Sequence, residues 1–438
     1  MSDIDPNVPS TWPLLTQGAA SVPRPPDWVE VDEGSELLVM RHPYVDEATF
    51  HPTIVVRSMP TSASLPALGA QAVAGVIGGM PGARLLAHDR GEIHGRLARG
   101  QVYAYDAGVH TIVAERWLAL AGAHAVEITA QCTVGQLEDM EPLFRAVLDH
   151  TLLTDSAVAD GPMPEPVREP TRDGFLAARS GLDVETLDRV SAAQPYTPVG
   201  PVLSDAAFRL VLDHIGQPSM NRSQAYSAHR EAAELVATGL MDPDGTFTEA
   251  FRLLTLPVAQ SRQTIRVEGV HRGEVTQLDV WFGGGGATVA SRASHAQLVH
   301  DDTSHAVPAG SVQVDVIREE SVPLAIAAWA GVGPAWTVVT GEDQIDLDRF
   351  QARLDHGPQI GPPEGADDAL LRLWAEPWFA WRVVMPGLER ELSWLGAGAA
   401  GQVRIRGVRD GRMHLLAEPS GYVWTTLVRE IGILAQVR

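Results

Sequence analysis

The chain has 438 residues and a formal net charge of −22, and its 33 Lys+Arg residues are all arginine. This length exceeds what one hydrophobic core can hold, so we expect two or three domains. The acidic balance argues against binding to nucleic acid or to an anionic membrane. The absence of lysine excludes Schiff-base and pyridoxal chemistry as well as P-loop nucleotide hydrolysis, because each needs a lysine amine.

Residues 1–153 predict an antiparallel sheet with two helices. Alternating apolar runs predict strands at Leu37 to Met40, Thr53 to Met59, Ala83 to Ala87, Gln101 to Tyr105, Thr111 to Leu120 and Ala125 to Cys132. Turns are expected at Asp89-Arg90-Gly91 and Ala107-Gly108. One helix is predicted from about Leu65 to Ile77. The other is predicted to begin near Asp139 as its N-cap, with Pro142 in its first turn.

Cys132 is the only cysteine, which excludes a disulfide, a cysteine-based zinc site and an iron–sulfur cluster. It shares one face of a predicted strand with Val126, Ile128 and Ala130. This pattern favours a buried core thiol over a nucleophile.

Residues 154–173 hold four prolines and five acidic residues with almost no large apolar group, so we expect a linker between domains 1–153 and 174–438. The first 23 residues contain no arginine and no continuous apolar run, so no secretory signal is expected. No stretch has the apolar length of a membrane helix. These features predict a cytoplasmic location.

After the linker, helices precede strands. Helices are expected from the N-cap Ser204 to Gly216, from about Arg222 to Thr238 and from about Thr248 to Leu254. The predicted strands are Thr264 to Glu268, Val275 to Phe282, Ala287 to Arg292 and Val312 to Ile317, with residues 283–286 as a glycine hairpin turn. Pro323 opens a helix that ends at Trp329.

A similar order recurs at the end of the chain. Helices are expected at about Leu347 to Leu354 and Asp367 to Ala375, strands at Trp378 to Met385, Gln402 to Gly407 and Met413 to Ala417, and a last helix from about Thr425. The rough duplication predicts two related halves that share one sheet. The expected fold class is therefore α+β, with an antiparallel-sheet domain followed by a larger quasi-twofold domain.

Residues 396–401 match the letters of G-x-G-x-x-G. A dinucleotide site needs this motif between a strand and a helix. Here residues 389–395 predict a helix and residues 402–407 predict a strand, so the order is reversed. We interpret the motif as a loop.

His295, His300 and His305, with Asp301 and Asp302, are the densest cluster of possible metal ligands. Steps of five alternate faces along a strand and rotate around a helix, so one regular element would not bring all three histidines together. This spacing favours a polar loop over a metal site.

In the first domain, His94 and His110 are considered as a pair that faces across strands near Tyr105. Histidines on a half-exposed sheet are usually solvated, so a catalytic role is the less favoured interpretation.

The second half is rich in tryptophan, at positions 281, 329, 336, 374, 378, 381, 394 and 424. Tryptophan is common both in cores and at the centres of interfaces, and core packing is favoured for any single one. Trp329-Ala330-Gly331 matches the W-x-G of small type VII secretion substrates. Because it ends a helix inside a large domain, we give the match no weight.

Two resemblances extend these predictions. In residues 11–153, the carrying features are Pro25-Pro26-Asp27-Trp28, the strand Phe50 to Val56 with the helix after it, and the final strand and helix from Ala125 to Leu153. They resemble the PsbP-like fold as it occurs in the LpqN-type lipoproteins of actinobacteria. Those lipoproteins carry a signal peptide and an acylated cysteine, neither of which is expected here, so the resemblance does not imply export or anchoring.

In residues 200–438, the carrying features are Leu203 to Phe208, Glu234 to Leu240, Leu253 to Pro257, Trp281-Phe282 and Val322 to Leu324. They are similar to the EspG family of type VII (ESX) secretion chaperones. The resemblance implies an acidic, cytosolic, non-enzymatic α+β protein with quasi-twofold halves, which binds the apolar tip of a helical substrate pair. It transfers no site residues.

We therefore expect a cytoplasmic, non-enzymatic chaperone or adaptor of type VII secretion, with the first domain as an added recognition module. No catalytic, cofactor-binding or metal-binding residue is predicted. Trp281 and Phe282 lie on opposite faces of one strand, so one of them is free for a protein partner. The alternatives are a hydrolase that uses histidine and carboxylates, and a structural protein that binds a small ligand.

Overall fold

The computed structural model describes residues 11–34, 36–43, 49–155, 184–187, 189–261, 263–336, 343–386 and 392–436. Helices and antiparallel sheets make up the described chain, so the α+β class is confirmed. The chain divides into a first unit, Met1–Arg189 with Gly333–Trp336, and a second unit, Val190–Val332 with Thr337–Arg438. The linker predicted at 154–173 lies outside the described residues from 156 onward.

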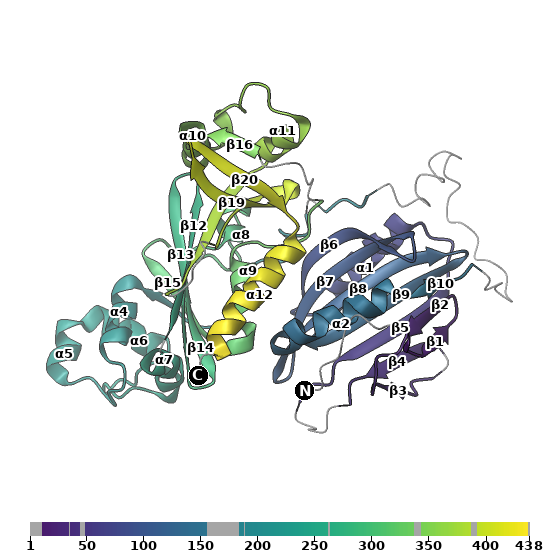
Figure 1. Cartoon of the computed structure of the whole chain (residues 1–438). Helices are drawn as coiled ribbons and strands as arrows, with labels where there is room; N and C mark the ends of the chain where they lie inside the picture. The colour runs from purple at the N-terminus through teal and green to yellow at the C-terminus, as the bar shows by residue number, and fades with distance from the viewer. Residues whose placement is uncertain are drawn as a thin grey trace. The chain divides into compact units, whose positions relative to one another are not determined.

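Within the described part of the first unit, seven strands form one antiparallel sheet (Figure 1). Its spatial order is β3 (Val29–Val31), β4 (Leu37–Arg41), β5 (Thr53–Pro60), β9 (His124–Thr133), β8 (His110–Ala121), β7 (Arg96–Ala107) and β6 (Arg84–Ile93). A small sheet joins β1 (Leu14–Gln17), β2 (Ala20–Pro23) and β10 (Leu152–Leu153). Helix α1 (Leu65–Gly79) packs on β6, β7 and β8, and α2 (Leu137–Asp149) packs on β9. The predicted strands and both helices are confirmed.

Two local predictions in this unit are wrong. Strand β6 continues through Asp89-Arg90-Gly91, and the chain turns at His94 and Gly95, which have φ values of 51° and 70°. Position 91 requires glycine because of packing, since a β-carbon there would collide with the indole of Trp117. Helix α2 begins at Leu137 rather than at an Asp139 cap, after a single 3-10 turn that Thr133 and Gln136 cap reciprocally.

In the described part of the second unit, ten strands form one antiparallel sheet. Their spatial order is β11 (Val202–Ser204), β15 (Ser311–Arg318), β14 (Gly286–Ser291), β13 (Glu274–Gly283), β12 (Thr264–His271), β17 (Trp378–Val384), β18 (Leu392–Ala397), β19 (Gln402–Arg409), β20 (Arg412–Glu418) and β16 (Asp343–Asp346). From the central strand β12 outward, the first half runs β12, β13, β14 and β15, and its opening strand β11 lies at the outer edge. From β17 outward, the second half runs β17, β18, β19 and β20, and its opening strand β16 lies at the opposite edge. The predicted pair of halves sharing one sheet is confirmed.

In each described half, α-helices follow the opening strand and an α-helix follows the last strand, and the first half has a further helix between β14 and β15. The first half contains α4 (Asp205–Asp213), α5 (Arg222–Ser227), α6 (His229–Ala237), α7 (Glu249–Gln260), α8 (His295–His300) and α9 (Val322–Trp329). The second half contains α10 (Leu347–His356), α11 (Asp368–Ala375) and α12 (Ser420–Gln436). Ser204, Thr248 and Asp367 each accept a hydrogen bond from the third residue of the helix they precede, as N-caps do. The single helix predicted over 222–238 is interrupted at Ala228.

The helix expected over 389–395 is also wrong. Residues 389–391 lie outside the described chain, and Leu392–Ala397 forms β18, in which every residue is buried. A strand covered on both faces shows no alternation, so its sequence resembles a helix segment. The motif at 396–401 therefore follows a strand, but it leads through one 3-10 turn (Gly398–Ala400) into β19. It connects two strands, as the loop interpretation required.

Tryptophan fills the core of the second unit. Among the described residues, the buried tryptophans of this unit are Trp329, Trp374, Trp378, Trp381, Trp394 and Trp424. Trp381 and Trp394 stack with their ring centres 4.5 Å apart, and Trp374 meets Trp378 edge to face at 4.8 Å. Most of the tryptophan enrichment thus serves packing, as favoured. No described helix combines the length and the hydropathy that crossing a membrane would demand.

Candidate functional site

The two predicted partner-binding residues lie at the end of β13. Trp281 and Phe282 are each half-buried. The Trp281 ring lies 6.3 Å from that of Phe208 and packs on the core of the first half, whereas Phe282 pairs with Ala287 across the hairpin. The turn that follows is Gly284–Gly285, with φ values of 65° and 81° that suit a two-residue hairpin.

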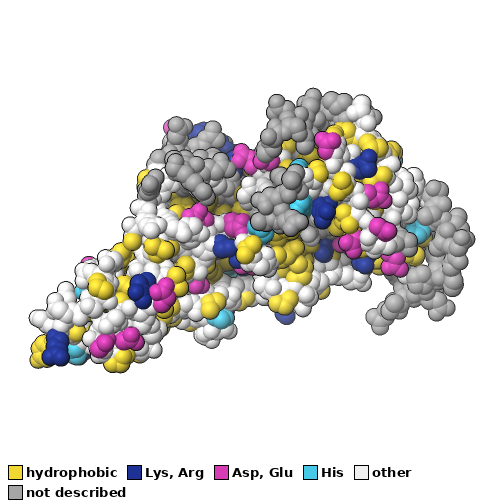
Figure 2. Space-filling view, turned by 90° about the horizontal axis from the view of Figure 1, so that it is seen from below, with side chains coloured by type: hydrophobic (Ala, Val, Ile, Leu, Met, Phe, Trp, Pro, Cys, Tyr) yellow, Lys and Arg dark blue, Asp and Glu magenta, His cyan; other side chains and the backbone are white. Residues whose placement is uncertain are grey.

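Two exposed leucines of α7 lie beside this hairpin. Leu253 is 55% exposed and Leu256 is 40% exposed, one helical turn apart. A β-carbon at Gly284 would lie 3.2 Å from Cδ2 of Leu256, so helix and hairpin tip adjoin. We call Trp281, Gly284, Leu253 and Leu256 the hairpin patch, because Phe282 follows Trp281 directly on β13 and points to the other face of the sheet. Figure 2 shows that, on the face seen from below, acidic and basic side chains are mixed with apolar ones rather than segregated.

The histidine cluster is structural within the described chain. His295 and His300 are the first and last residues of α8, so the polar loop expected there is wrong. Their rings meet edge to face at 5.2 Å, and His295 also contacts Phe379 at 5.3 Å inside the core. His305 is exposed in the next turn. No set of three possible ligands among the described residues could hold a metal ion.

Gly331, the glycine of the W-x-G tripeptide, has a packing role. It follows the C-terminus of α9 with a φ of 72°, and a β-carbon there would collide with the ring of His295. Trp329 is buried, and its Nε1 donates to the carbonyl of Arg292 at 3.2 Å. The tripeptide is thus part of the core.

Gly331→Ala is expected to lower the free energy of unfolding of the second unit by about 2 kcal/mol. The change combines a left-handed backbone with a forced shift of His295. Urea unfolding would measure it. Gly361→Ala is the control, because no atom lies within 4 Å of its β-carbon position. Equal stability of the two variants would contradict this role for Gly331.

His94 and His110 do not meet. His94 lies in the turn before β7 and its Nδ1 accepts from the amide of Leu153 at 3.1 Å, whereas His110 follows the turn at the other end of β7. Tyr105 stacks on Tyr103 at 6.3 Å. The pairing considered from the sequence is wrong, because a hairpin strand separates the two histidines by its full length.

Cys132 is buried, as predicted. Burial raises the pKa of its thiol well above the ordinary value, and nearby Glu115 and Glu141 add to the effect. A thiol that stays protonated is a poor nucleophile.

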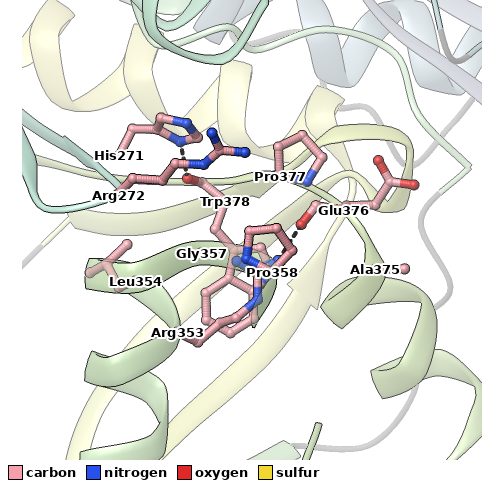
Figure 3. Close-up of a pocket in the computed structure, with 10 residues that line it drawn as sticks. All are labelled: His271, Arg272, Arg353, Leu354, Gly357, Pro358, Ala375, Glu376, Pro377 and Trp378. Carbon is pink, nitrogen blue, oxygen red and sulfur yellow. Dashed lines mark hydrogen bonds between the residues drawn. The ribbon is translucent and has the colours of Figure 1, made fainter. Parts of the chain in front are cut away.

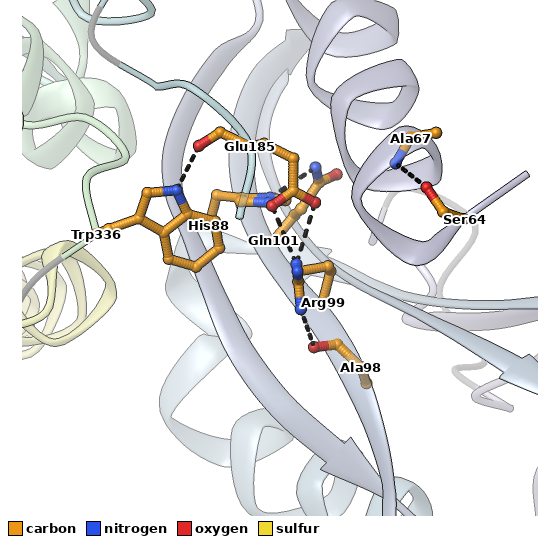
Figure 4. A network of polar contacts seen from close by, with 8 residues as sticks. All are labelled: Ser64, Ala67, His88, Ala98, Arg99, Gln101, Glu185 and Trp336. Carbon is orange, nitrogen blue, oxygen red and sulfur yellow. Dashed lines mark hydrogen bonds and ion pairs between the residues drawn. The ribbon is translucent and has the colours of Figure 1, made fainter. Parts of the chain in front are cut away.

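A buried polar cluster in the first unit gathers four side chains (Figure 4). His88 on β6 pairs with Gln101 on β7, and Arg99 shares the face of Gln101. Nε of Arg99 donates to both carboxylate oxygens of Glu185, at 3.0 and 3.1 Å. Nε2 of Gln101 donates to Nδ1 of His88 at 3.0 Å. Nε2 of His88 lies 3.5 Å from Oε2 of Glu185.

Gly69 and Trp336 complete this cluster. A β-carbon at Gly69 of α1 would collide with Oε1 of Glu185, so the glycine leaves the space that the carboxylate occupies. Nε1 of Trp336 donates to the main-chain carbonyl of Glu185 at 2.6 Å, and its ring lies 5.1 Å from that of His88. The guanidinium of Arg99 lies 5.5 Å from the same indole, within cation–π range.

Charge pairing holds Glu185 ionised. Burial opposes ionisation, but the contacts with His88 and the charge of Arg99 outweigh it and hold the pKa of this carboxyl below its usual range. For Asp89, which follows His88 in the chain, burial outweighs the effect of His88 and raises the pKa to about 6. A carboxylate paired in this way anchors residues 184–187 to the sheet.

The anchored segment borders an apolar cavity of about 390 Å³ along α1. Its walls are Ala70, Val73, Ala74, Ile77 and Gly78 from the helix, with Glu185, Thr186 and Leu187 from the segment. Sequence reasoning missed the whole cluster. Arg99 and Glu185 are 86 positions apart, and neither belongs to a motif.

No protein-family model matches the chain, and no curated protein matches it. Solved structures are similar to part of it. LpqN, involved in cell envelope biogenesis of Mycobacterium tuberculosis, is 13% identical over 32% of this chain and 90% of its own, with a TM-score of 0.26. Cyanobacterial PsbP from Synechocystis is 15% identical over 32% of this chain and 89% of its own, also at 0.26. A Pseudomonas aeruginosa protein of unknown function is 16% identical over 35% of this chain and 98% of its own, with a TM-score of 0.24.

The LpqN and PsbP resemblances expected for the first domain are thus found among solved structures, over 32% of the chain in each case. The EspG resemblance of the second domain stays a prediction.

Proposed function

We propose that the protein is a non-enzymatic binding protein that holds an apolar helical partner at the hairpin patch. The supporting observation is the exposure of Leu253 and Leu256 on α7, the helix that packs on β13 on the side of the half-buried Trp281. Exposed leucines one helical turn apart suit the apolar face of an amphipathic helix. The net charge of −22 helps to keep a protein with such a patch soluble.

The cellular role that we propose is that of a cytoplasmic chaperone or adaptor of type VII secretion, with small helical secretion substrates as partners. This step rests on the EspG resemblance of residues 200–438. The first unit would add a second recognition surface, for which the cavity along α1 is the candidate.

The hydrolase alternative has weaker support. The described histidine–carboxylate pair, His88 and Glu185, is buried, and Arg99 already neutralises the carboxylate. A general base needs to reach the proton of its substrate. A cluster enclosed beneath Trp336 is better suited to anchoring a segment.

Direct binding tests the proposal. Helical protein pairs encoded beside a secretion ATPase in the same genome would be titrated against the purified full chain. We expect one pair to bind, and we expect Leu253→Asp with Leu256→Asp to weaken that binding about thirtyfold, because charge is buried at the contact.

Leu371→Asp is the matched control, since Leu371 is a 43% exposed leucine on α11, outside the hairpin patch. Its binding should equal that of the unaltered protein. If no pair binds, or if the double variant binds as tightly as the control, the proposed site is wrong.

A further inference from the structure

The second unit contains a small cavity of about 150 Å³ with an unusual charge balance (Figure 3). It lies where the turn after β12 meets α10 and the connection from α11 to β17. His271, Arg272, Arg353 and Trp378 contribute to its wall. His271 is fixed there, because its Nδ1 hydrogen-bonds to the carbonyl of Trp378 at 2.7 Å.

Arg353 is a buried cation at this cavity, 2% exposed. Its Nη2 donates to the carbonyls of Trp374 and Glu376 at 2.9 and 2.8 Å, at the C-terminal end of α11. Its guanidinium lies 4.9 Å from the ring centre of Trp378. Its Nε is buried and has no hydrogen-bond partner within the described chain.

No described carboxylate forms an ion pair with Arg353. The acidic residue in the wall, Glu376, uses Oε2 to accept from the amide of Ala399 at 3.1 Å. In Figure 3 its carboxylate points away from the guanidinium. Burial, followed by the charge of Arg272, lowers the pKa of Arg353. Carbonyls and an indole stabilise a buried guanidinium only in part, because neither supplies a counter-charge.

Arg272 brings a second cation to the same space. It occupies the two-residue turn Arg272–Gly273 with a φ of 49°, a position where glycine, asparagine or aspartate is the usual choice. Its Nε lies 3.3 Å from the place of a β-carbon at Gly357, so its side chain lies along the rim of the cavity. Arginine has no conformational preference that would favour this turn. Two like charges at one cavity favour an anion between them.

We propose that this cavity binds an oxyanion group, a phosphate or a carboxylate, between Arg272 and Arg353. Planar guanidinium groups match the paired oxygens of both anions. The volume would hold several water molecules at about 30 Å³ each, but pockets for whole drug-sized ligands start at roughly 300 Å³. The site therefore fits a charged head group rather than a complete nucleotide. A free ion or the charged end of a larger ligand could supply it.

Calorimetric titration of the full chain with sodium phosphate, and separately with sodium acetate, tests this at constant ionic strength set with chloride. We expect one anion to bind with a stoichiometry of one. Phosphate alone would identify a phosphate site; acetate alone would identify a carboxylate site. Arg272→Gln should weaken the binding at least about tenfold, because a charged hydrogen-bond donor is lost while the buried Arg353 keeps its structural bonds.

Arg409→Gln is the matched control. Arg409 is exposed, precedes the Asp410–Gly411 turn between β19 and β20, and is not part of the cavity wall. The Arg409→Gln variant should bind the anion as tightly as the unaltered protein does. The proposal is overturned if neither anion binds, if Arg272→Gln binds as tightly as the unaltered protein, or if Arg409→Gln weakens binding equally.

Discussion

Arg99→Met is expected to lower the free energy of unfolding of the first unit by about 3 kcal/mol. The side chain of Glu185 is 3% exposed and would keep its charge beneath α1 without the guanidinium that now donates to both of its oxygens. Removing one partner of a buried ion pair costs more than the pair itself contributes, because the remaining charge stays desolvated. Hydrogen exchange of the amides of β6 and β7 would report this loss for the first unit within the full chain.

A double variant separates charge pairing from simple loss of volume. Arg99→Met with Glu185→Gln removes both charges, so it should be more stable than Arg99→Met alone. Arg96→Met is the matched control, because Arg96 lies on the same strand and pairs with Asp155 at the surface. Ion pairs at the surface contribute little to stability, so hydrogen exchange in Arg96→Met should hardly differ from that in the unaltered protein. Simple additivity of the two changes in the double variant would show that Arg99 and Glu185 are not coupled.

The same pair predicts a pH dependence. Since the pKa of Glu185 is lower in the folded state, its contribution is fully present above the unfolded value near 4.3 and is lost as the pH falls through the folded value. The difference between Arg99→Met and the unaltered protein should therefore shrink below about pH 4. A difference that stays constant from pH 7 to pH 3 would contradict the charge argument.

Much of the fold is local enough to be predicted from the sequence. Period-two alternation located the strands of the first unit, and side-chain caps such as Ser204 and Thr248 located helix starts to within a residue. The repeated order of helices and strands predicted the two halves of the ten-stranded sheet in the described chain. The alternation and the caps depend on residues fewer than about ten positions apart, and the repeat is a sum of such local signals.

Several of the failures share a physical cause, which is burial by distant parts of the chain. Strand β18 is covered on both faces, so it shows no alternation. Gly91 looked like a turn residue because Trp117, far along the chain, was not known to cover it. The Arg99–Glu185 pair and the cavity between Arg272 and Arg353 combine residues about eighty positions apart, and no spacing rule relates them.

Trp394→Ala is expected to lower the free energy of unfolding of the second unit by about 4 kcal/mol. Trp394 is fully buried on β18 and stacks on Trp381, and its removal leaves a cavity that neighbouring strands cannot close. Urea unfolding followed by circular dichroism would measure the loss. Trp281→Ala is the control. Because Trp281 is only half-buried, its replacement should lower the free energy of unfolding much less.

A second substitution at Trp394 separates packing from hydrogen bonding. Nε1 of Trp394 donates to Oε2 of Glu418 at 2.5 Å, and Trp394→Phe keeps an aromatic ring but removes this donor. Burial already raises the pKa of Glu418, so its ionised form is disfavoured in the folded state and stability falls as the pH rises through that range. Without the indole donor the pKa rises further. Trp394→Phe should therefore be more destabilising at pH 8 than at pH 5, and an equal loss at both would show that Trp394 acts through packing alone.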